Sequence, residues 1–302
     1  MKRIILVYNP RSSRFAEVKT DVIDKVYALK GYMIGKYEVE KTDVDKNSVK
    51  LSKILKDGDL VLSAGGDATA QIAANSILKS NKDASLAVLP YGNFNDLSRT
   101  LQTDTIEQIF NQKTTTHKLY PLEIIIDGKL FRYATCYVTI GMTAEAVRLY
   151  DTPKVRKKLK TNFGRKVSSY TSLASWYFKN RHKKIFLPEF KLNGKLQHRK
   201  TSDYAAMNGR SMARVMKGGE DYQNPKIFRS ETDRLTNFWR LFKLMTKSIL
   251  NRVPGTETTG DLLEFTTLGT VAIQAEGEYH TFKNVKTIEI KKGDKCLKVI
   301  EN

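Results

Sequence analysis

Apolar runs and segments of helical spacing alternate along the first 120 residues. Short apolar stretches that end at Pro, Gly or Asn are typical of buried strands, and apolar residues three or four positions apart are typical of helices. The predicted strands are residues 4–7, 37–39, 60–62 and 86–89, and the predicted helices are residues 15–30, 49–55 and 69–79. This alternation predicts a mostly parallel sheet that is covered by helices on both faces.

The rest of the chain is rich in strand-like patterns, and turn signals such as Asp127-Gly128 and Asn193-Gly194 separate some of them. The predicted strands are residues 122–126, 131–140, 185–192, 202–207, 262–265, 271–274 and 285–290. We therefore expect two domains with a boundary near Tyr120-Pro121. Residues 1–120 would form the α/β domain, and residues 121–302 would form a β-sandwich domain.

Two segments interrupt the strands of the second domain. Residues 154–166 carry seven basic side chains and no acidic one, and residues 235–250 place apolar side chains on one face of a helix with basic side chains mainly on its other faces. Such a basic amphipathic helix can lie in a membrane interface. Alternatively, its apolar stripe packs on the sandwich and its charges are only solvated, and the pattern leaves both interpretations open.

The excess of basic residues bears on the choice of partner. The chain has 52 Lys and Arg against 32 Asp and Glu, a net charge of +20. This charge favours a nucleotide, a nucleic acid or an anionic membrane as a neighbour, or it serves solubility alone. Because no aromatic side chains are interleaved with the basic ones and no nucleic-acid-binding module is recognisable, we expect no specific nucleic-acid partner.

The two cysteines, Cys136 and Cys296, have no spacing of a metal or redox site, so we expect them to be reduced in a cytoplasmic protein. The first apolar run ends at Asn9-Pro10, which makes it too short for a signal peptide. No stretch approaches the ~20 apolar residues of a membrane span. We therefore expect a cytoplasmic chain whose contact with a membrane is peripheral.

The strongest local motif is the turn Ser63-Ala-Gly-Gly-Asp-Ala-Thr69, between a predicted strand and a predicted helix. Two glycines allow a phosphate to approach the backbone at a helix N-terminus, and Thr69 can donate a hydroxyl hydrogen bond. A carboxylate repels phosphate, so Asp67 would hold Mg²⁺ or accept a proton. The plain alternative is a tight turn capped by Asp67 or Thr69.

A second motif, Leu89-Pro-Tyr-Gly-Asn-Phe-Asn-Asp-Leu-Ser-Arg99, also follows a predicted buried strand. Its two asparagines, Asn93 and Asn95, can offer amides to a phosphate or a ribose. Both motifs lie at the carboxyl ends of strands, where parallel α/β sheets bind ligands. The alternative is a Gly-Asn loop followed by a helix that Asp96 caps.

These motifs together resemble the diacylglycerol kinase catalytic-domain family, which includes bacterial lipid kinases and sphingosine kinases. The resemblance rests on the Gly-Gly-Asp-x-Thr turn at residues 65–69 and the Pro-x-Gly-x-x-Asn-Asp-x-x-Arg segment at residues 90–99. Residues 9–13, 140–145 and 275–278 are similar to further family elements, in the family's order. The resemblance implies a first domain like that of NAD kinases and phosphofructokinases, a β-sandwich, and an active site between them. It also implies that residues after about 286 return to the first domain.

The resemblance implies an ATP- and Mg²⁺-dependent kinase that phosphorylates a lipid hydroxyl, diacylglycerol-like or on a long-chain base, at an anionic membrane surface. A homodimer is also possible. Glu278 would be the proton acceptor, and Asp67 would organise the nucleotide and its Mg²⁺ or share the base role. The residues implied to bind the nucleotide are Asn9, Thr42, Gly65, Gly66, Asp67, Ala68, Thr69, Ala70, Gln71, Gly92, Asn93, Asn95 and Asp96.

The sequence departs from the family's pattern at several of these positions. Ala68 stands where the family usually has Gly, and an alanine would be strained there if the backbone needs a positive φ. Glu276 replaces the commoner Asp, and Asp233 matches the family's structural metal aspartate poorly. These departures leave two alternatives open: a catalytically weakened member that binds nucleotide or lipid, or a small-molecule kinase like NAD kinase. His280, two residues beyond Glu278, is expected to be a surface strand histidine.

Overall fold

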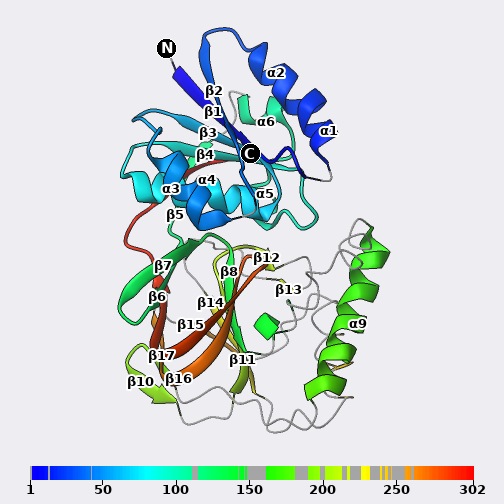
Figure 1. Cartoon of the computed structure of the whole chain (residues 1–302), viewed down its shortest axis with the longest axis vertical. Helices are drawn as coiled ribbons and strands as arrows, with labels where there is room; N and C mark the ends of the chain where they lie inside the picture. Colours follow the sequence, from blue (N-terminus) through cyan, green and yellow to red (C-terminus); the bar gives the residue numbers. More distant parts are fainter. Residues whose placement is uncertain are drawn as a thin grey trace. The chain divides into compact units, whose positions relative to one another are not determined.

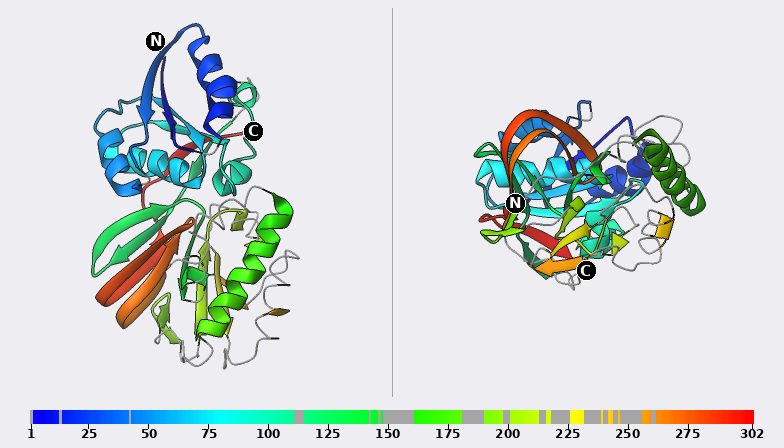
Figure 2. Two further views of the ribbon diagram at one scale, coloured as in Figure 1. Left: turned by 45° about the vertical axis from the view of Figure 1, so that its right-hand side comes forward. Right: turned by 90° about the horizontal axis from the view of Figure 1, so that it is seen from below.

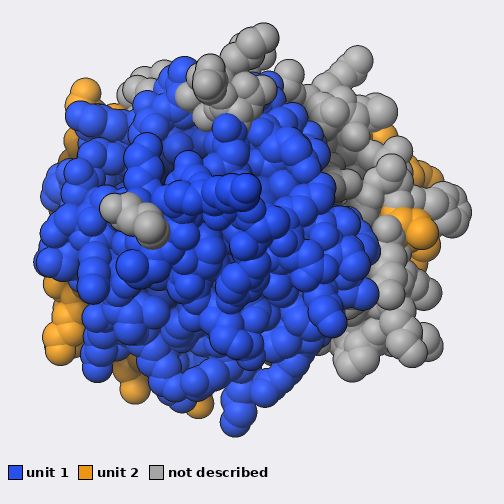
Figure 3. All heavy atoms as spheres, turned by 90° about the horizontal axis from the view of Figure 1, so that it is seen from above, with its two compact units in different colours: residues 1–121, 293–302 blue, residues 122–292 orange. Residues whose placement is uncertain are grey.

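The structure, a computed structural model, describes the chain except for residues 1, 13, 42, 111–114, 142, 146, 148–160, 181–189, 198–200, 213–215, 218–225, 232–238, 240–241, 244–245, 247–255 and 260–261. The chain divides into two compact units, coloured separately in Figure 3. Unit 1 is Met1–Pro121 with Gly293–Asn302, and unit 2 is Leu122–Lys292. Unit 1 is an α/β unit with a mostly parallel sheet and unit 2 is built on an antiparallel sheet, so the expected fold class is confirmed.

The sheet of unit 1 has the strand order β2-β1-β3-β4-β18-β5 (Figure 1). Its first five strands run parallel, and β5 pairs antiparallel with β18 at the edge. The strands are β1 (Lys2–Tyr8), β2 (Tyr32–Glu38), β3 (Leu60–Gly65), β4 (Ser85–Pro90), β5 (Thr115–Leu119) and β18 (Leu297–Glu301). Continuous apolar stretches in β1, β3 and β4 are buried, as expected for strands that are covered on both faces.

Helices cover both faces of this sheet, as Figures 1 and 2 show. The chain leaves β1 toward β2 on one side and leaves β3 toward β4 on the other, so right-handed connections place their helices on opposite faces. The helical elements of unit 1 are α1 (Phe15–Val18), the π-helical segment η1 (Lys19–Ile23), α2 (Asp24–Tyr27), α3 (Val44–Ser52), α4 (Asp67–Ser80), α5 (Asp96–Leu101) and α6 (Ile106–Phe110). Val18, Val22 and Val26 pack with α6 and the strands in one core cluster.

The last residues of the chain are integrated into unit 1. β18 pairs with β4 and β5, and the backbone N–H of Asn302 donates to the carbonyl oxygen of Leu101 over 3.2 Å. The ammonium group of Lys295 donates to the carbonyl oxygen of Leu78 over 3.1 Å and also to the side chain of Asn81. A cation at the C-terminal end of α4 also complements the helix dipole, so the tail stabilises the helix it contacts.

The sheet of unit 2 follows the order β15-β14-β11-β8-β16-β17-β6-β7, with β9 joined to β16 and β10 to β9. A two-stranded pair, β12 with β13, and the long helix α9 accompany it (Figure 1). The elements are β6 (Leu122–Ile126), β7 (Lys129–Ala134), β8 (Tyr137–Gly141), α9 (Asn162–Asn180), β9 (Phe190–Leu192), β10 (Lys195–Gln197), β11 (Thr201–Met207), β12 (Ser211–Met212), β13 (Met216–Lys217), β14 (Lys226–Glu231), β15 (Thr256–Thr259), β16 (Leu262–Ala275) and β17 (Glu278–Lys292).

The hairpin of β16 and β17 lets one sheet form two layers. Register shifts near Gly269 break its pairing, and β-bulges of this kind bend strands. The first part of β16 pairs with β9, and its last part pairs with β8. The last part of β17 pairs with β6. The side chains enclosed between these strands form one core cluster, with Tyr204, Phe190 and Phe265 at its aromatic centre. This arrangement agrees with the predicted sandwich.

Several predicted elements differ in detail from the structure. The helix predicted at residues 49–55 is α3, which begins at Val44 because the Asp43 side chain caps it by accepting from Lys46 N over 3.0 Å. Residues 131–140 form two strands, since the chain turns at Thr135-Cys136. The two strands predicted at residues 262–265 and 271–274 are one bulged strand, β16.

Candidate functional site

Three loops of unit 1 follow adjacent strands at the same edge of the sheet. Residues 9–14 follow β1, residues 65–67 end β3 and begin α4, and residues 91–95 follow β4. Because β1, β3 and β4 are parallel neighbours, their carboxyl ends lie side by side. The strand order also reverses between β1 and β3, and α/β sheets bind ligands at such a switch point. The two glycine motifs of the sequence therefore lie in one place.

The loops after β3 and β4 touch through glycine backbones. A Cβ atom on Gly92 would lie 2.3 Å from the Cα of Gly66, and one on Gly66 would lie 3.1 Å from the Cα of Gly92. The N–H of Tyr91 also donates to the carbonyl oxygen of Gly65 over 2.9 Å. Only residues without a side chain allow this approach, which explains a glycine at both positions.

Asp67 joins the two loops through its carboxylate. Its Oδ2 accepts the backbone N–H of Asn95 at 3.1 Å, and its Oδ1 accepts the backbone N–H of Asp96 at 2.7 Å. Two N–H groups at the start of α5 thus find an acceptor outside the helix, and a charged acceptor makes each bond stronger than a neutral one. The observed contacts of Asp67 are those of a tie between the two loops.

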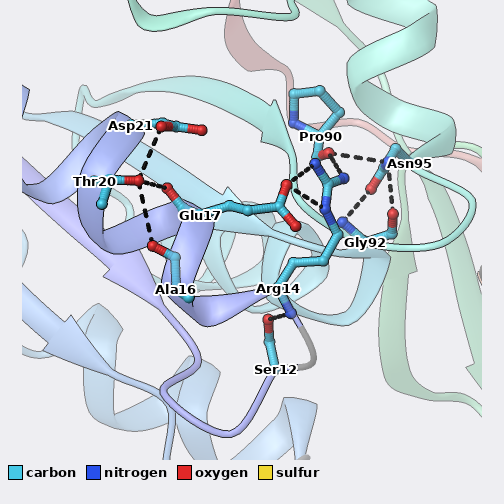
Figure 4. Close-up of polar contacts among 9 residues, drawn as sticks. All are labelled: Ser12, Arg14, Ala16, Glu17, Thr20, Asp21, Pro90, Gly92 and Asn95. Atoms are coloured by element: carbon cyan, nitrogen blue, oxygen red, sulfur yellow. Dashed lines mark hydrogen bonds and ion pairs between the residues drawn. The ribbon is translucent and has the colours of Figure 1, made fainter.

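Asn95 closes the second loop on itself. Its backbone has a φ of 56° and a ψ of 47°, a left-handed conformation that asparagine tolerates better than most residues. Its Oδ1 accepts the N–H of Gly92 at 2.7 Å, and its Nδ2 donates to the carbonyl oxygens of Gly92 and Pro90 (Figure 4). The amide of Asn95 is therefore used within the loop. The half-buried Asn93 makes no side-chain hydrogen bond to another described residue.

The loop after β1 is joined to the loop after β4 by Arg14. Its Nη1 donates to the carbonyl oxygen of Pro90 over 2.9 Å, and its guanidinium also pairs with Glu17 (Figure 4). Its Cζ atom lies 5.2 Å from the centre of the Tyr91 ring. The hydrogen bond from Arg14 lowers the pKa of Glu17, and the bond to Glu17 raises the pKa of Arg14. Asn9 stabilises the same loop by accepting the N–H of Arg11 at 2.9 Å.

Residues 67–71 form the first turns of α4, and the helix begins after Gly66. Ala68 has an ordinary helical backbone, since it is absent from the residues with positive φ. The strain that the sequence suggested at this position therefore does not arise. Thr69, Ala70 and Gln71 are buried, and the N–H groups of Thr69 and Ala70 donate to the carbonyl oxygen of Gly66.

Unit 2 brings the later motifs together at the turn between β16 and β17. Glu276 and Gly277 have φ values of 48° and 88°, as a two-residue hairpin turn requires. The buried carboxylate of Glu276 accepts from the Thr135 hydroxyl at 2.7 Å and from the backbone N–H of Cys136. In the residues that follow, the hydroxyl of Tyr279 donates to Glu145 over 3.3 Å. Glu276 thus connects two turns of this unit.

Glu278, the predicted proton acceptor, lies at the start of β17 with a partly exposed side chain. Its Oε2 accepts from Nη1 of the buried Arg132 at 2.5 Å and lies 3.6 Å from Nε2 of His280. Arg132 lies outside the sequence motifs that point to this site. A charged residue within the apolar strand Leu130-Phe-Arg-Tyr-Ala134 is the signal that could have found it, because burial of a charge needs a partner.

Two candidate residues, Thr42 and Asp233, lie outside the described residues. Within the described part of the chain, no group of three or more His, Cys, Asp or Glu side chains is arranged to hold a metal ion. Each carboxylate oxygen of Asp67 accepts one backbone N–H group, and lone pairs remain on both oxygens. The metal-binding role of Asp67 therefore stays a prediction.

The fold and the loops define a class of protein: a parallel α/β unit with glycine loops at the carboxyl ends of its strands, joined to an antiparallel β unit. Residues 3–125 match the family model of the diacylglycerol kinase catalytic domain. This match supports the resemblance found in the motifs of residues 3–125.

Relatives of this chain include two staphylococcal diacylglycerol kinases. The protein from Staphylococcus saprophyticus is 23% identical over 181 residues, which cover 57% of this chain and 55% of that protein. A protein from Staphylococcus epidermidis is 32% identical over 103 residues, 33% of this chain and 32% of that protein. The matched parts thus span about half of the first relative and about a third of the second.

Solved structures share the fold over the whole chain. The crystal structure of a diacylglycerol kinase from Bacillus anthracis matches with a TM-score of 0.64 over 100% of this chain and 97% of that chain. A further structure from the same organism has a TM-score of 0.66. Their sequence identities are 13% and 15%, so this similarity shows the fold alone.

Proposed function

We propose that this chain is a kinase that transfers the γ-phosphoryl group of ATP, bound with Mg²⁺, to the hydroxyl group of a lipid. The observation that carries the proposal is the set of loops after β1, β3 and β4, which Arg14 and Asp67 tie together beside the N-terminus of α4. Such backbone-lined loops suit phosphate groups. The match of residues 3–125 to the diacylglycerol kinase catalytic domain supports a phosphotransferase reaction.

For phosphoryl transfer, the protein mainly has to position the reactants and neutralise charge. The transferred group passes through a loose transition state, so catalysis comes mainly from holding the phosphates and aligning the acceptor hydroxyl. Mg²⁺ enters as part of the nucleotide substrate and neutralises charge on its phosphates. In this proposal the loops of unit 1 hold the nucleotide, and Glu278 accepts the proton of the lipid hydroxyl.

Asp67 takes a positioning role in this proposal. Its carboxylate accepts two backbone N–H groups, which sets the distance between the two glycine loops. We therefore assign the proton-accepting role to Glu278, whose Oε1 has no partner among the described residues. The ordinary backbone of Ala68 removes the main sequence-based support for a catalytically weakened protein.

The proposals of a lipid acceptor and of a membrane surface rest on the family match of residues 3–125 and on charge. The chain carries a net charge of +20, and no helix among the described residues is long and apolar enough to cross a membrane. An acceptor in a bilayer would then be reached by peripheral attachment to an anionic surface. A diacylglycerol-like lipid and a long-chain base are the two acceptor classes that we propose.

The direct test is an assay with ATP labelled at the γ-phosphate and a mixed lipid extract, with the product identified by mass. We expect one labelled phospholipid that forms only with Mg²⁺ and falls about 10²-fold or more in Glu278→Gln. NAD and a sugar phosphate serve as parallel acceptors. Labelling of either of these without any labelled lipid would replace the lipid kinase by a small-molecule kinase.

A further inference from the structure

Arg132 is the bulkiest side chain that is completely buried among the described residues, and it is 1% exposed. A guanidinium taken out of water costs free energy unless it is paired, and an apolar side chain of similar volume often serves stability as well or better. The strand around it, β7, otherwise buries Tyr133 and Ala134. A buried arginine at this point of the core is therefore not explained by stability alone.

Arg132 is paired with the carboxylate of Glu278. Nη1 of Arg132 and Oε2 of Glu278 are 2.5 Å apart, although the two residues are 146 positions apart in the chain. Nε2 of His280 lies 3.6 Å from the same oxygen. Two nitrogens from two strands, β7 and β17, thus flank one carboxylate oxygen.

Aromatic rings hold these nitrogens in place. The Cζ atom of Arg132 lies 5.0 Å from the centre of the Phe131 ring, and the His280 ring meets Phe131 edge-on at 5.0 Å. Phe282 packs against Phe131 at 5.0 Å and tilts against His280. The rotamers of Arg132 and His280 are therefore restricted by packing, which is what a precisely held group requires.

The contact of Arg132 with Oε2 of Glu278 also affects the other carboxylate oxygen, Oε1. Arg132 holds Oε2, and Oε1 has no hydrogen-bond partner among the described residues. The Glu278 side chain keeps 21% of its surface exposed, so Oε1 is the oxygen that can meet an acceptor hydroxyl. A base acts only when it lies within hydrogen-bond reach of the proton it takes.

We propose that Arg132 is a positioning residue that holds Oε2 of Glu278 and aims Oε1 at the acceptor hydroxyl, with His280 as a second contact on Oε2. The inference rests on the proposed function, because it assigns a purpose to the ion pair only if Glu278 accepts a proton. In the step itself the hydroxyl O–H bond breaks, the proton passes to Oε1, and the freed oxygen attacks the γ-phosphorus while the bond to ADP breaks.

The kinetic test compares Arg132→Met, which keeps the volume, with Arg132→Lys, which keeps the charge. We expect kcat to fall about tenfold or more in Arg132→Met with the KM for ATP unchanged, and Arg132→Lys to recover part of it. His280→Gln should lower kcat by a smaller factor.

A matched control is a part-buried arginine–carboxylate pair in unit 1. Nε of Arg3 lies 2.7 Å from Oδ1 of the buried Asp59, at the amino end of the strands and away from the loops. Arg3→Met should lower the melting temperature and leave kcat and the KM for ATP unchanged. If Arg132→Met behaves in the same way, Arg132 is structural only and the inference is wrong.

A second measurement needs no substrate. Melting temperatures of Arg132→Met, Glu278→Gln and the double variant form a cycle, and we expect the double variant to lose less than the sum of the single losses. Additive losses would show that the two side chains do not interact and would overturn the inference, whether or not the enzyme is active. A coupled pair in a protein that phosphorylates no acceptor would overturn the proposed function, and the role of Arg132 with it.

Discussion

The carboxylate of Asp67, in the glycine turn before α4, binds the backbone of the neighbouring loop. Chemistry alone assigns an acid in this turn to Mg²⁺ or to proton transfer, because a carboxylate repels phosphate. In the structure both of its oxygens accept backbone N–H groups, from Asn95 and Asp96. The sequence could not reveal this, since the two loops are about thirty residues apart and no pattern links them.

Asp67→Asn tests this assignment. The amide can accept one of the two N–H groups but presents a donor to the other, which leaves one without an acceptor at a cost of about 1–3 kcal/mol. We expect a lower melting temperature together with weaker MgATP binding by calorimetry. Asp24→Asn, an exposed acid on α2, is the matched control and should change neither. Unchanged stability and ATP affinity with a large loss of kcat would instead make Asp67 the base.

Ala68→Gly separates the sequence-based expectation from the structural one. If this position needed a positive φ, glycine would improve nucleotide binding. Because Ala68 lies in the first turn of α4 with an ordinary backbone, glycine should lower the free energy of unfolding by about 0.5–1 kcal/mol. We expect ATP affinity to stay the same or to fall. A clear gain in affinity or turnover would show that the side chain crowds the phosphates.

The elements of unit 1 were largely predictable because continuous apolar runs and Gly or Pro boundaries carry a strong signal. Residues 60–62 and 86–89 are the centres of β3 and β4, and the Asp127-Gly128 turn has the left-handed φ values of 49° and 74° that the sequence implied. The split between β7 and β8 was not predictable, since the turn at Thr135-Cys136 has no glycine or proline. A buried hydrogen bond from Thr135 to Glu276 stabilises that turn instead.

The candidate site was predictable to the same extent. The two glycine loops follow strand ends, so their neighbourhood on one sheet edge could be inferred from the topology. Arg14 could not be inferred, because one basic residue among 52 carries no pattern of its own, and for Arg132 the apolar strand around it signals burial but not its partner. Their roles depend on contacts with residues 76 and 146 positions away, which only the fold provides.

Arg14, directly before α1, is hydrogen-bonded to Pro90 at the end of β4, and this contact leads to a prediction. Arg14→Ala removes the bond to Pro90, and we expect MgATP affinity to fall about tenfold, which corresponds to one charge-assisted hydrogen bond. Lys19→Ala removes an exposed charge from η1, the segment that follows α1, and is the control for charge alone. Equal losses in both variants would mean that charge, and not the tie, supports binding.

The stability contributed by the ion pair of Arg14 and Glu17 should depend on pH in a defined direction. The pKa of Glu17 is lowered in the folded protein by the hydrogen bond from Arg14. The stability from the Arg14–Glu17 pair is therefore present above the unfolded pKa of about 4.3 and is lost as the pH falls through the folded value. Since Glu17 is exposed, we expect Glu17→Gln to change the melting temperature only slightly at pH 7 and not at all at the acid end.

At the scale of the whole molecule, the proposed reaction draws on both units: the nucleotide loops belong to unit 1 and the predicted base belongs to unit 2. The segments that we expect to meet a membrane also belong to unit 2. Most of residues 154–166 and 235–250 lie outside the described residues. The described part includes the exposed Trp239 and Phe242, whose rings are 6.0 Å apart, with Tyr170 of α9 at 5.6 Å from Phe242.

Membrane attachment can be measured by sedimentation with neutral and anionic liposomes at rising salt. Each basic residue near an anionic surface contributes about 1 kcal/mol, and salt screens it within about 10 Å at 0.1 M. We expect binding to anionic vesicles that weakens with salt and falls when Lys157, Lys158 and Lys160 are all changed to Glu. Trp239→Ala should weaken binding without changing its dependence on salt. Binding that ignores lipid charge, salt and these variants would eliminate the electrostatic attachment.

The central claim, that the loops of unit 1 hold a nucleotide, is tested most directly by hydrogen exchange of the whole protein with and without MgATP. The account predicts protection of backbone amides in residues 9–14, 65–71 and 90–97, where the tied loops follow β1, β3 and β4. In Asp67→Asn this protection should be lost at the same nucleotide concentration. Protection confined to other parts of the chain, or no change on adding MgATP at millimolar concentration, would contradict the account.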